Sequence, residues 1–182
     1  LEDEGHFLLC RGGTHGDQTN VSVIWPGDLD ASFAKHGEQI TVDGKKYSAV
    51  GGLPAALIAG LSLGPSGFPF YGSDTGGYRH SPPDKELFTR WFQSTALSPV
   101  MQIGTSTNDV AWEPTPKNGF DQEMLGWYRS YTRLHLRLFP YIWTYATRLQ
   151  TDGRPIQRAL GPAHPAPGAH PPPTLSPPPP PP

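Results

Sequence analysis

The stretch that most constrains this chain reads Phe70-Tyr71-Gly72-Ser73-Asp74-Thr75-Gly76-Gly77-Tyr78. An apolar approach is followed by a carboxylate, two glycines and an aromatic ring. Glycine lets the backbone bend freely where a strand ends, and an aromatic ring can pack against the face of a sugar. The order predicts a strand that presents Asp74 at the edge of a sheet, with Tyr78 close behind it.

A second carboxylate follows an apolar segment upstream, in the stretch Val21-Ser22-Val23-Ile24-Trp25-Pro26-Gly27-Asp28. Two strand ends that each present an acid beside an aromatic residue indicate part of a carbohydrate-processing pocket. The alternative is that these carboxylates only cap helices or turns. We favour the cap for Asp28 or Asp74 taken alone. We favour the pocket when all the polar strand ends, with Arg11 and residues 102–105, are taken together.

Short apolar segments that end in glycine or a polar residue predict four strands, at residues 7–10, 21–25, 68–71 and 99–103. Helical patterns cover residues 53–63, 83–92 and 121–150. Pro140 lies inside the last of these and should bend that helix or split it in two. Strands that alternate with helices are typical of βαβ units on a parallel sheet, so the predicted fold class is α/β. The tryptophans of the helices, Trp91, Trp127 and Trp143, are expected to pack in the core.

The proline content divides the chain near Gly161, because 12 of its 23 prolines follow that residue. A proline-rich segment lacks backbone donors and cannot bury much apolar surface, so it favours extended, disordered structure. We therefore expect one ordered domain at residues 1–160 and a disordered proline-rich tail at residues 161–182. The size of the domain allows a real hydrophobic core.

The overall composition argues against several classes of function. A formal net charge of −2 and a pI near 6.4 give no electrostatic footprint for nucleic acid or an anionic membrane. No apolar run approaches the roughly 20 residues that a membrane helix requires. The single cysteine and the spacing of the seven histidines do not match a metal site, and no glycine-rich loop has the pattern of a phosphate or dinucleotide site. We expect no metal and no cofactor.

Residues 7–160 resemble glycoside hydrolase family 31, the α-glucosidase and α-xylosidase group. Residues 25–28 are similar to the acid/base motif of that family, and residues 72–78, followed by residues 87–91, to its second signature. Residues 138–144 and 153–158 resemble two further motifs, a helix and the turn that follows it. The motifs are long and occur in the family's order, so the resemblance covers nearly all of the predicted domain.

The resemblance implies a (β/α)8 TIM barrel, here represented by about strands 5–8, and a retaining enzyme that hydrolyses terminal α-linked glucosides or related sugars. Asp28 would be the catalytic acid/base, with Trp25 as a wall of the sugar site. Asp74 and Arg11 would bind sugar hydroxyls, and Tyr78 would line the pocket floor. In retaining enzymes the acid/base and the nucleophile lie about 5–5.5 Å apart.

Two departures from the family pattern affect the expected activity. The family's nucleophile segment, of the type Trp-x-Asp-x-Asn-Glu, does not occur in this sequence, so we expect the isolated chain to be inactive and to need a missing N-terminal half of the barrel as its partner. Gln102 and Gly104 stand where many members carry an arginine and a histidine, which indicates altered contacts to the sugar.

The two ends of the sequence lead us to expect a fragment. The acidic start, residues 1–4, suggests a chain that begins mid-protein, and the change at Gly161 suggests a reading frame that fails there. Two alternatives to a fragment of an enzyme remain open. One is a sugar-binding remnant without catalysis, and the other is a non-functional truncated product.

Overall fold

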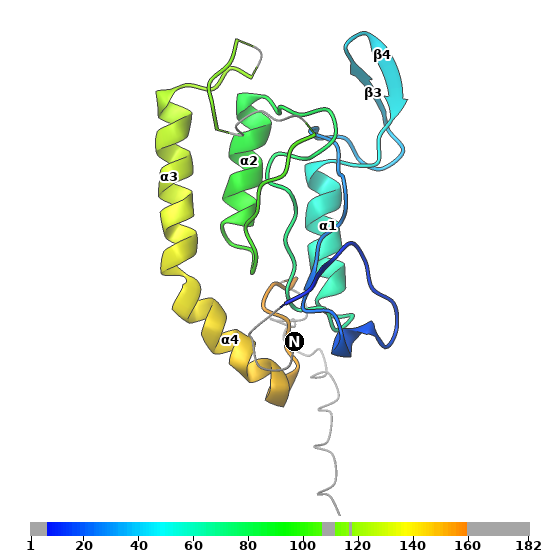
Figure 1. The fold of residues 1–182 in the computed structure, drawn as a ribbon, viewed down its shortest axis with the longest axis vertical. Coiled ribbons are helices and arrows are strands. Elements are labelled where there is room, and N and C mark those ends of the chain that lie inside the picture. Colours follow the sequence, from blue (N-terminus) through cyan, green and yellow to red (C-terminus); the bar gives the residue numbers. More distant parts are fainter. Residues whose placement is uncertain (1–6, 107–111, 117, 160–182) are drawn as a thin grey trace, which may run out of the picture.

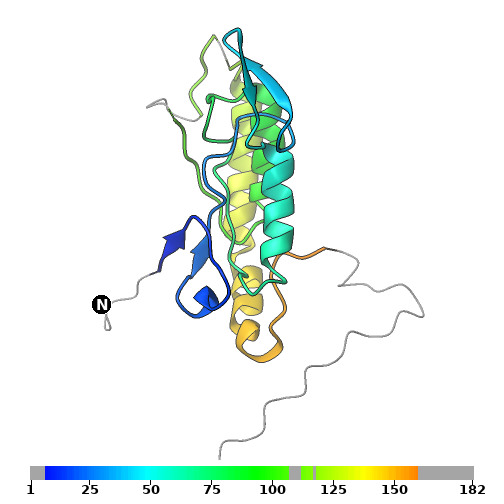
Figure 2. The same cartoon turned by 90° about the vertical axis from the view of Figure 1, so that its right-hand side faces the viewer.

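The computed structural model describes residues 7–106, 112–116 and 118–159 (Figure 1). In chain order its elements are β1 (Leu9–Cys10), the 3-10 helix η1 (Asp17–Thr19), β2 (Val23–Ile24), β3 (Gln39–Val42), β4 (Lys45–Ser48), α1 (Leu53–Leu63), α2 (Lys85–Thr95), α3 (Gln122–Arg137) and α4 (Phe139–Asp152). Helices α1, α2 and α3 lie side by side in chain order, and α4 continues from the end of α3 at an angle (Figures 1 and 2).

The four predicted strand segments are parallel neighbours in chain order. β1 pairs with β2 in parallel, with Leu9 opposite Val23. Single parallel bridges then join Ile24 to Tyr71 and Asp74 to Gln102. The parallel arrangement predicted from the sequence is therefore confirmed.

The predicted lengths of the strands were wrong. β1 and β2 have two residues each, and the third and fourth segments contribute only isolated bridges. Pro69 and Pro99 lie in these last two segments, and proline has no N–H to donate to a strand ladder. The backbone there is held by separate contacts, such as the hydrogen bond from Val100 N–H to the Tyr71 carbonyl at 3.3 Å.

The hairpin of β3 and β4 was not predicted from the sequence. Its strands pair antiparallel, with Val42 opposite Lys45. Asp43 and Gly44 form the two-residue turn, and both have positive φ, 49° and 75°. Asp-Gly is a preferred pair for such a turn because both central positions require positive φ. That dipeptide, between Val42 and Lys45, was the signal in the sequence.

The helices follow the predictions closely. α1 has the predicted bounds, with Pro54 in its first turn. α2 begins after Asp84, whose side chain accepts a hydrogen bond from Leu87 N–H at 2.8 Å and so caps the helix. The predicted interruption at Pro140 is confirmed, since α3 ends at Arg137 and α4 begins at Phe139. A proline cannot donate the backbone hydrogen bond that a continuous helix needs there.

Three clusters of buried residues hold these elements together. The first joins α1 to α2 and contains Leu29, Leu53, Ala56, Leu87 and Trp91; the second joins α2 to α3 and contains Phe88, Phe92, Phe120 and Met124; the third joins the strand segments to α1 and contains Ile24, Phe68 and Tyr71. Trp91 is fully buried, and its indole N–H donates to Ser73 Oγ at 2.9 Å. Helix α2 is thereby attached to the residue that precedes Asp74.

The prediction that the helical tryptophans pack in the core is correct for Trp91 and wrong for the other two. Trp127 is 40% exposed and Trp143 is 60% exposed. Their faces of α3 and α4 are left uncovered by the part of the chain that the structure describes. Among these same residues, no helix has the length and apolar character needed to cross a membrane.

The aromatic cluster between α2 and α3 should dominate stability. Phe92 is fully buried, with ring centroids of Phe88, Tyr128 and Tyr131 at 5.3–5.6 Å. Truncation of such a residue leaves a cavity, so Phe92→Ala should lower the free energy of unfolding by about 3–5 kcal/mol. The matched control, Phe33→Ala, removes a ring that is 48% exposed and should cost less than about 1 kcal/mol. Urea unfolding measures both, and equal losses would contradict this account of the core.

Candidate active site

The candidate residues lie where the parallel segments end. Arg11 follows β1, Trp25 and Asp28 follow β2, and Asp74 and Gln102 bridge the third and fourth segments. In parallel sheets the carboxyl ends of neighbouring strands meet at one edge, which is where ligand-binding residues gather.

A chain of contacts joins four of the five predicted site residues. Arg11 Nη2 lies 2.6 Å from Asp28 Oδ1, and the Arg11 guanidinium lies over the Trp25 ring, 4.7 Å from its centroid. The Trp25 indole N–H donates to Asp74 Oδ2 at 2.9 Å. Asp28 and Asp74, distant in sequence, are thus joined in one cluster through Arg11 and Trp25.

Asp74 is the most enclosed member of this cluster, with 7% of its surface exposed. Its Oδ1 accepts a hydrogen bond from Gln102 Nε2 at 3.2 Å. A Cβ at Gly104 would lie only 2.6 Å from that oxygen, so glycine is what allows the fourth segment to approach the carboxylate this closely. Gln102 and Gly104, where the sequence departs from the pattern of the family that it resembles, therefore both lie against the Asp74 carboxylate.

The surroundings of Asp74 favour its neutral form. Burial raises the pKa of the carboxyl above its ordinary value of 3.8, and the hydrogen bond from Trp25 opposes that rise. The negative charge of Asp28 raises the pKa further, while Gln102 and Arg11 lower it. The net direction is upward, because burial outweighs the donors.

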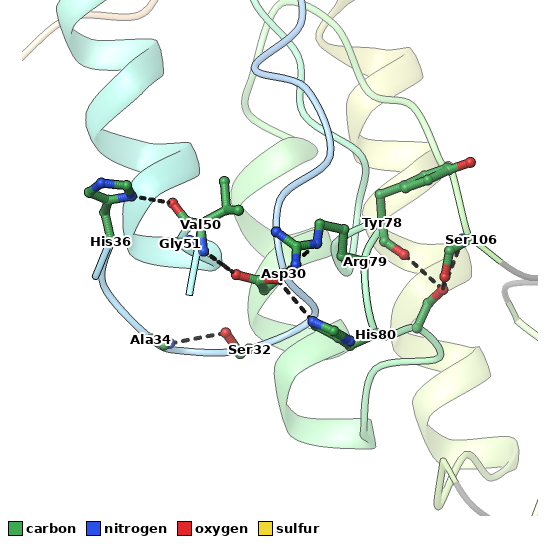
Figure 3. A network of polar contacts seen from close by, with 11 residues as sticks. Asp30, Ser32, Ala34, His36, Val50, Gly51, Tyr78, Arg79, His80 and Ser106 are labelled. Carbon is green, nitrogen blue, oxygen red and sulfur yellow. Dashed lines mark hydrogen bonds and ion pairs between the residues drawn. The ribbon is translucent and has the colours of Figure 1, made fainter. Parts of the chain in front are cut away.

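Tyr78 is placed by its backbone. Its N–H donates to the Leu29 carbonyl at 2.9 Å, and its carbonyl accepts from Ser81 Oγ at 2.9 Å and from Ser106 N–H at 3.2 Å. The side chain extends away from Asp30 (Figure 3). The role of Tyr78 in a pocket floor stays a prediction.

Asp30 is a buried charged residue that the sequence reasoning missed. It is fully buried, and its Oδ2 accepts from Val50 N–H at 2.7 Å and Gly51 N–H at 3.1 Å (Figure 3). Its Oδ1 lies 3.6 Å from Arg79 Nε and 3.4 Å from His80 Nε2. The available signal was a carboxylate between Leu29 and Ala31, since a charge flanked by apolar residues beyond a strand is often buried with partners.

Two cavities in the described part of the chain lie away from these residues. One, of about 590 Å³, lies between α2 and α3 and includes Lys85, Thr89 and Trp127 in its lining. The other, of about 290 Å³, lies beside α4 and includes Phe70 and Trp143. Within residues 7–106, 112–116 and 118–159, no group of three or more histidine, cysteine, aspartate or glutamate side chains is arranged to hold a metal ion.

Comparison with known proteins identifies the fold. The family model for the glycosyl hydrolases family 31 TIM-barrel domain matches residues 1–145. The isomaltosyltransferase of Sporosarcina globispora is 28% identical over 165 residues, which are 86% of this chain and 13% of that protein. The α-xylosidase of Saccharolobus solfataricus is 28% identical over 158 residues (84% and 18%), and α-glucosidase 2 of Bacillus thermoamyloliquefaciens is 29% identical over 160 residues (88% and 18%).

Solved structures agree in fold. The cycloalternan-degrading enzyme from Trueperella pyogenes has a TM-score of 0.64 at 24% identity, over 84% of this chain and 20% of that one. A family 31 sulfoquinovosidase from E. rectale has a TM-score of 0.58 at 25% identity, over 84% and 21%. The chain thus spans about a fifth or less of the relatives that it matches.

The raised pKa of Asp74 predicts how stability depends on pH. A carboxyl whose pKa is higher in the folded state binds more protons folded than unfolded, so its contribution is fully present below 3.8 and is lost as the pH rises through the folded pKa. Asp74→Asn has no carboxyl at this position, so it does not lose this part of the stability as the pH rises. The free energy of unfolding of Asp74→Asn, relative to that of the unchanged chain, should therefore increase as the pH rises from about 3 to about 7.

Urea unfolding at a series of pH values measures this difference. Asp43→Asn is the matched control, since Asp43 lies exposed in the β3–β4 turn and asparagine also tolerates its positive φ. The same pH trend in both variants would show that burial of Asp74 is not its cause.

Proposed function

The chain belongs to glycosyl hydrolase family 31, and we propose that it is part of a retaining α-glycosidase that hydrolyses terminal α-linked glucosides or related sugars. The observation that carries the proposal is the contact chain from Asp28 through Arg11 and Trp25 to Asp74. Two carboxylates, a cation and an indole at one edge of a parallel sheet are the groups that a sugar-cleaving pocket uses.

The relatives support a saccharide substrate without selecting one sugar. Their names describe an α-xylosidase, an α-glucosidase and an isomaltosyltransferase. The Trueperella enzyme has been solved with isomaltose, and a Listeria monocytogenes protein with glucose. We therefore propose an α-linked sugar as the ligand of this site, with the sugar and the linkage left open.

Asp28 is proposed as the general acid/base. In the first step its proton would pass to the glycosidic oxygen as the bond to the anomeric carbon breaks; in the second step it would take a proton from the attacking water. The Asp28 side chain is 34% exposed, so a substrate can reach it. The Arg11 ion pair at its Oδ1 would have to give way to the substrate oxygen. That exchange is cheap, because an ion pair this exposed contributes about 0–1 kcal/mol.

Substrate binding is assigned to the remaining residues of the cluster. Arg11 can donate several hydrogen bonds to sugar hydroxyls, and its side chain is 61% exposed. The Trp25 ring would form one wall of the site, while its indole N–H donates to Asp74 and holds that side chain in position. Asp74 would accept hydrogen bonds from hydroxyls, and Tyr78 would form the floor.

The nucleophile is proposed to come from outside these 182 residues, because the family's nucleophile segment is absent from the sequence. We propose that the chain supplies about strands 5–8 of the barrel and that its partner is the N-terminal half. The exposed side chains of Leu8 and Leu9, 54% and 45%, support a further element packing beside β1.

A second candidate is a sugar-binding remnant without catalysis. It is favoured by the same absence of a nucleophile segment and by the contact between Arg11 and Asp28, which engages the proposed acid. Binding of a sugar without hydrolysis is its signature.

Loss of the Arg11 cation should weaken sugar binding. A charged hydrogen bond contributes about 1.5–3 kcal/mol, so Arg11→Ala should lower the affinity for 1-deoxynojirimycin, an iminosugar, by roughly 10- to 150-fold. Isothermal titration calorimetry of the 182-residue chain measures this. Arg133→Ala, at an exposed position of α3, is the control and should bind like the unchanged chain. Equal affinities in Arg11→Ala and Arg133→Ala would remove Arg11 from the site.

The isolated chain should not turn over 4-nitrophenyl α-glucoside. Removal of a catalytic nucleophile costs on the order of 10⁴–10⁶ in rate, which leaves nothing measurable above background. Absorbance of released nitrophenol, compared between the unchanged chain and Asp28→Asn, is the assay. Robust hydrolysis that Asp28→Asn abolishes would mean that a nucleophile lies within these residues.

A further inference from the structure

The buried carboxylate of Asp30 lies where three segments of the chain meet. Asp30 N–H donates to the Gly51 carbonyl at 2.9 Å, which joins it to the start of α1. The next residue, Ala31, donates its N–H to the Arg79 carbonyl at 2.7 Å, which joins it to the turn after Asp74. Asp30 therefore lies between the loop that carries Asp28 and the turn that carries Tyr78.

The two segments approach so closely that a side chain would separate them. A Cβ at Gly77 would lie 2.7 Å from Ala31 Cα, and Gly77 has a φ of 83°. The Leu29 carbonyl accepts hydrogen bonds from both Tyr78 N–H and Arg79 N–H, each at 2.9 Å. A change in this junction would therefore move the loop that carries Asp28 relative to the turn that carries Tyr78.

The Asp30 carboxylate is satisfied on one oxygen only. Oδ2 accepts two backbone N–H groups, whereas Oδ1 faces His80 Nε2 at 3.4 Å and Arg79 Nε at 3.6 Å (Figure 3). Among the described residues, neither Oδ1 nor His80 Nε2 has a hydrogen-bond partner, although both atoms are buried. A proton on Nε2 of His80, directed at Oδ1, would satisfy both atoms at once.

His80 is held in position for that contact. Its φ is 62°, its side chain is 18% exposed, and its ring lies 4.9 Å from the ring of Tyr47 on β4. A backbone in the left-handed region is uncommon for a residue other than glycine and persists where the surroundings hold it.

Resting on the proposed function, we propose that Asp30 is a positioning residue of the sugar site: its ion pair with protonated His80 fixes the turn that carries Asp74 and Tyr78 against the loop that carries Asp28. Histidine changes charge between about pH 5 and pH 8. The charged ring always carries a proton on Nε2 and adds an ionic attraction, so the contact with Oδ1 strengthens as the pH falls. A neutral ring keeps the hydrogen bond, without the charge, only in the tautomer protonated on Nε2 and loses it in the other, so the contact weakens as the pH rises.

The other charged and titratable groups around the pair limit the size of the effect. Arginine side chains stay charged across this pH range, so Arg79 still attracts the Asp30 carboxylate when the His80 ring is neutral. Tyr47 packs on the His80 ring, and His36 contacts the Val50 carbonyl through Nδ1 at 3.0 Å. His36 is therefore the second histidine whose charge could reach the junction.

The indole N–H of Trp25 reports on the junction, because it donates to Asp74 Oδ2 and the Asp74 carbonyl accepts from Gly77 N–H at 3.0 Å. In a two-dimensional ¹H–¹⁵N NMR titration of the 182-residue chain, the Trp25 indole signal should shift in a step that follows protonation of the His80 ring. His80→Asn should abolish this step, since asparagine is neutral and tolerates positive φ. His36→Asn should retain it, and Asp30→Asn should lose it.

The unchanged chain and His80→Asn both keep Asp74, so a step that is present in the first and absent from the second is assigned to His80. A purely structural role for the pair would lower the melting temperature of His80→Asn but leave the pH course of the indole signal unchanged, and that result would overturn the proposal. Loss of the step in His36→Asn instead would also overturn it. No sugar is added, so a chain that failed to bind sugar would still test this inference.

Discussion

The parallel alignment of four chain segments is the constraint on which the candidate site depends. Each segment ends at the same edge, so residues that follow different segments arrive together: Arg11 from the first, Trp25 and Asp28 from the second, Asp74 from the third. Only a few backbone hydrogen bonds fix this alignment, because the strands are short. Buried side chains supply the rest, above all Trp91, which anchors the residue before Asp74 to α2.

Much of this arrangement could be predicted from the sequence, since the informative signals are local. Pro140 predicts a break in a helix, which the structure confirms. The apolar segment before Asp74 predicts a parallel strand, and the structure has the parallel neighbours there but only isolated bridges. The grouping of Asp28 with Asp74 followed because parallel strands align their carboxyl ends. The roles of these residues in binding and catalysis are a different matter and stay proposals.

The parts that could not be predicted depend on contacts between distant segments. Nothing near Asp30 in the sequence indicates that Arg79 and His80 will face it, and that pairing determines whether a buried charge is tolerated. The exposure of Trp127 and Trp143 has the same origin. Amphipathic spacing predicts that one face of a helix is apolar, but whether a neighbour covers that face is decided by the whole fold.

The electrostatics of the cluster are set mainly by the burial of Asp74. Burial raises the pKa of its carboxyl, and the negative charge of Asp28 raises it further. Arg11 opposes part of this rise, and its side chain is largely exposed, so it can exchange partners with a ligand. A group that drew the guanidinium away would remove this opposition and so favour the neutral form of the Asp74 carboxyl. The position of Arg11 and the protonation of Asp74 are therefore linked.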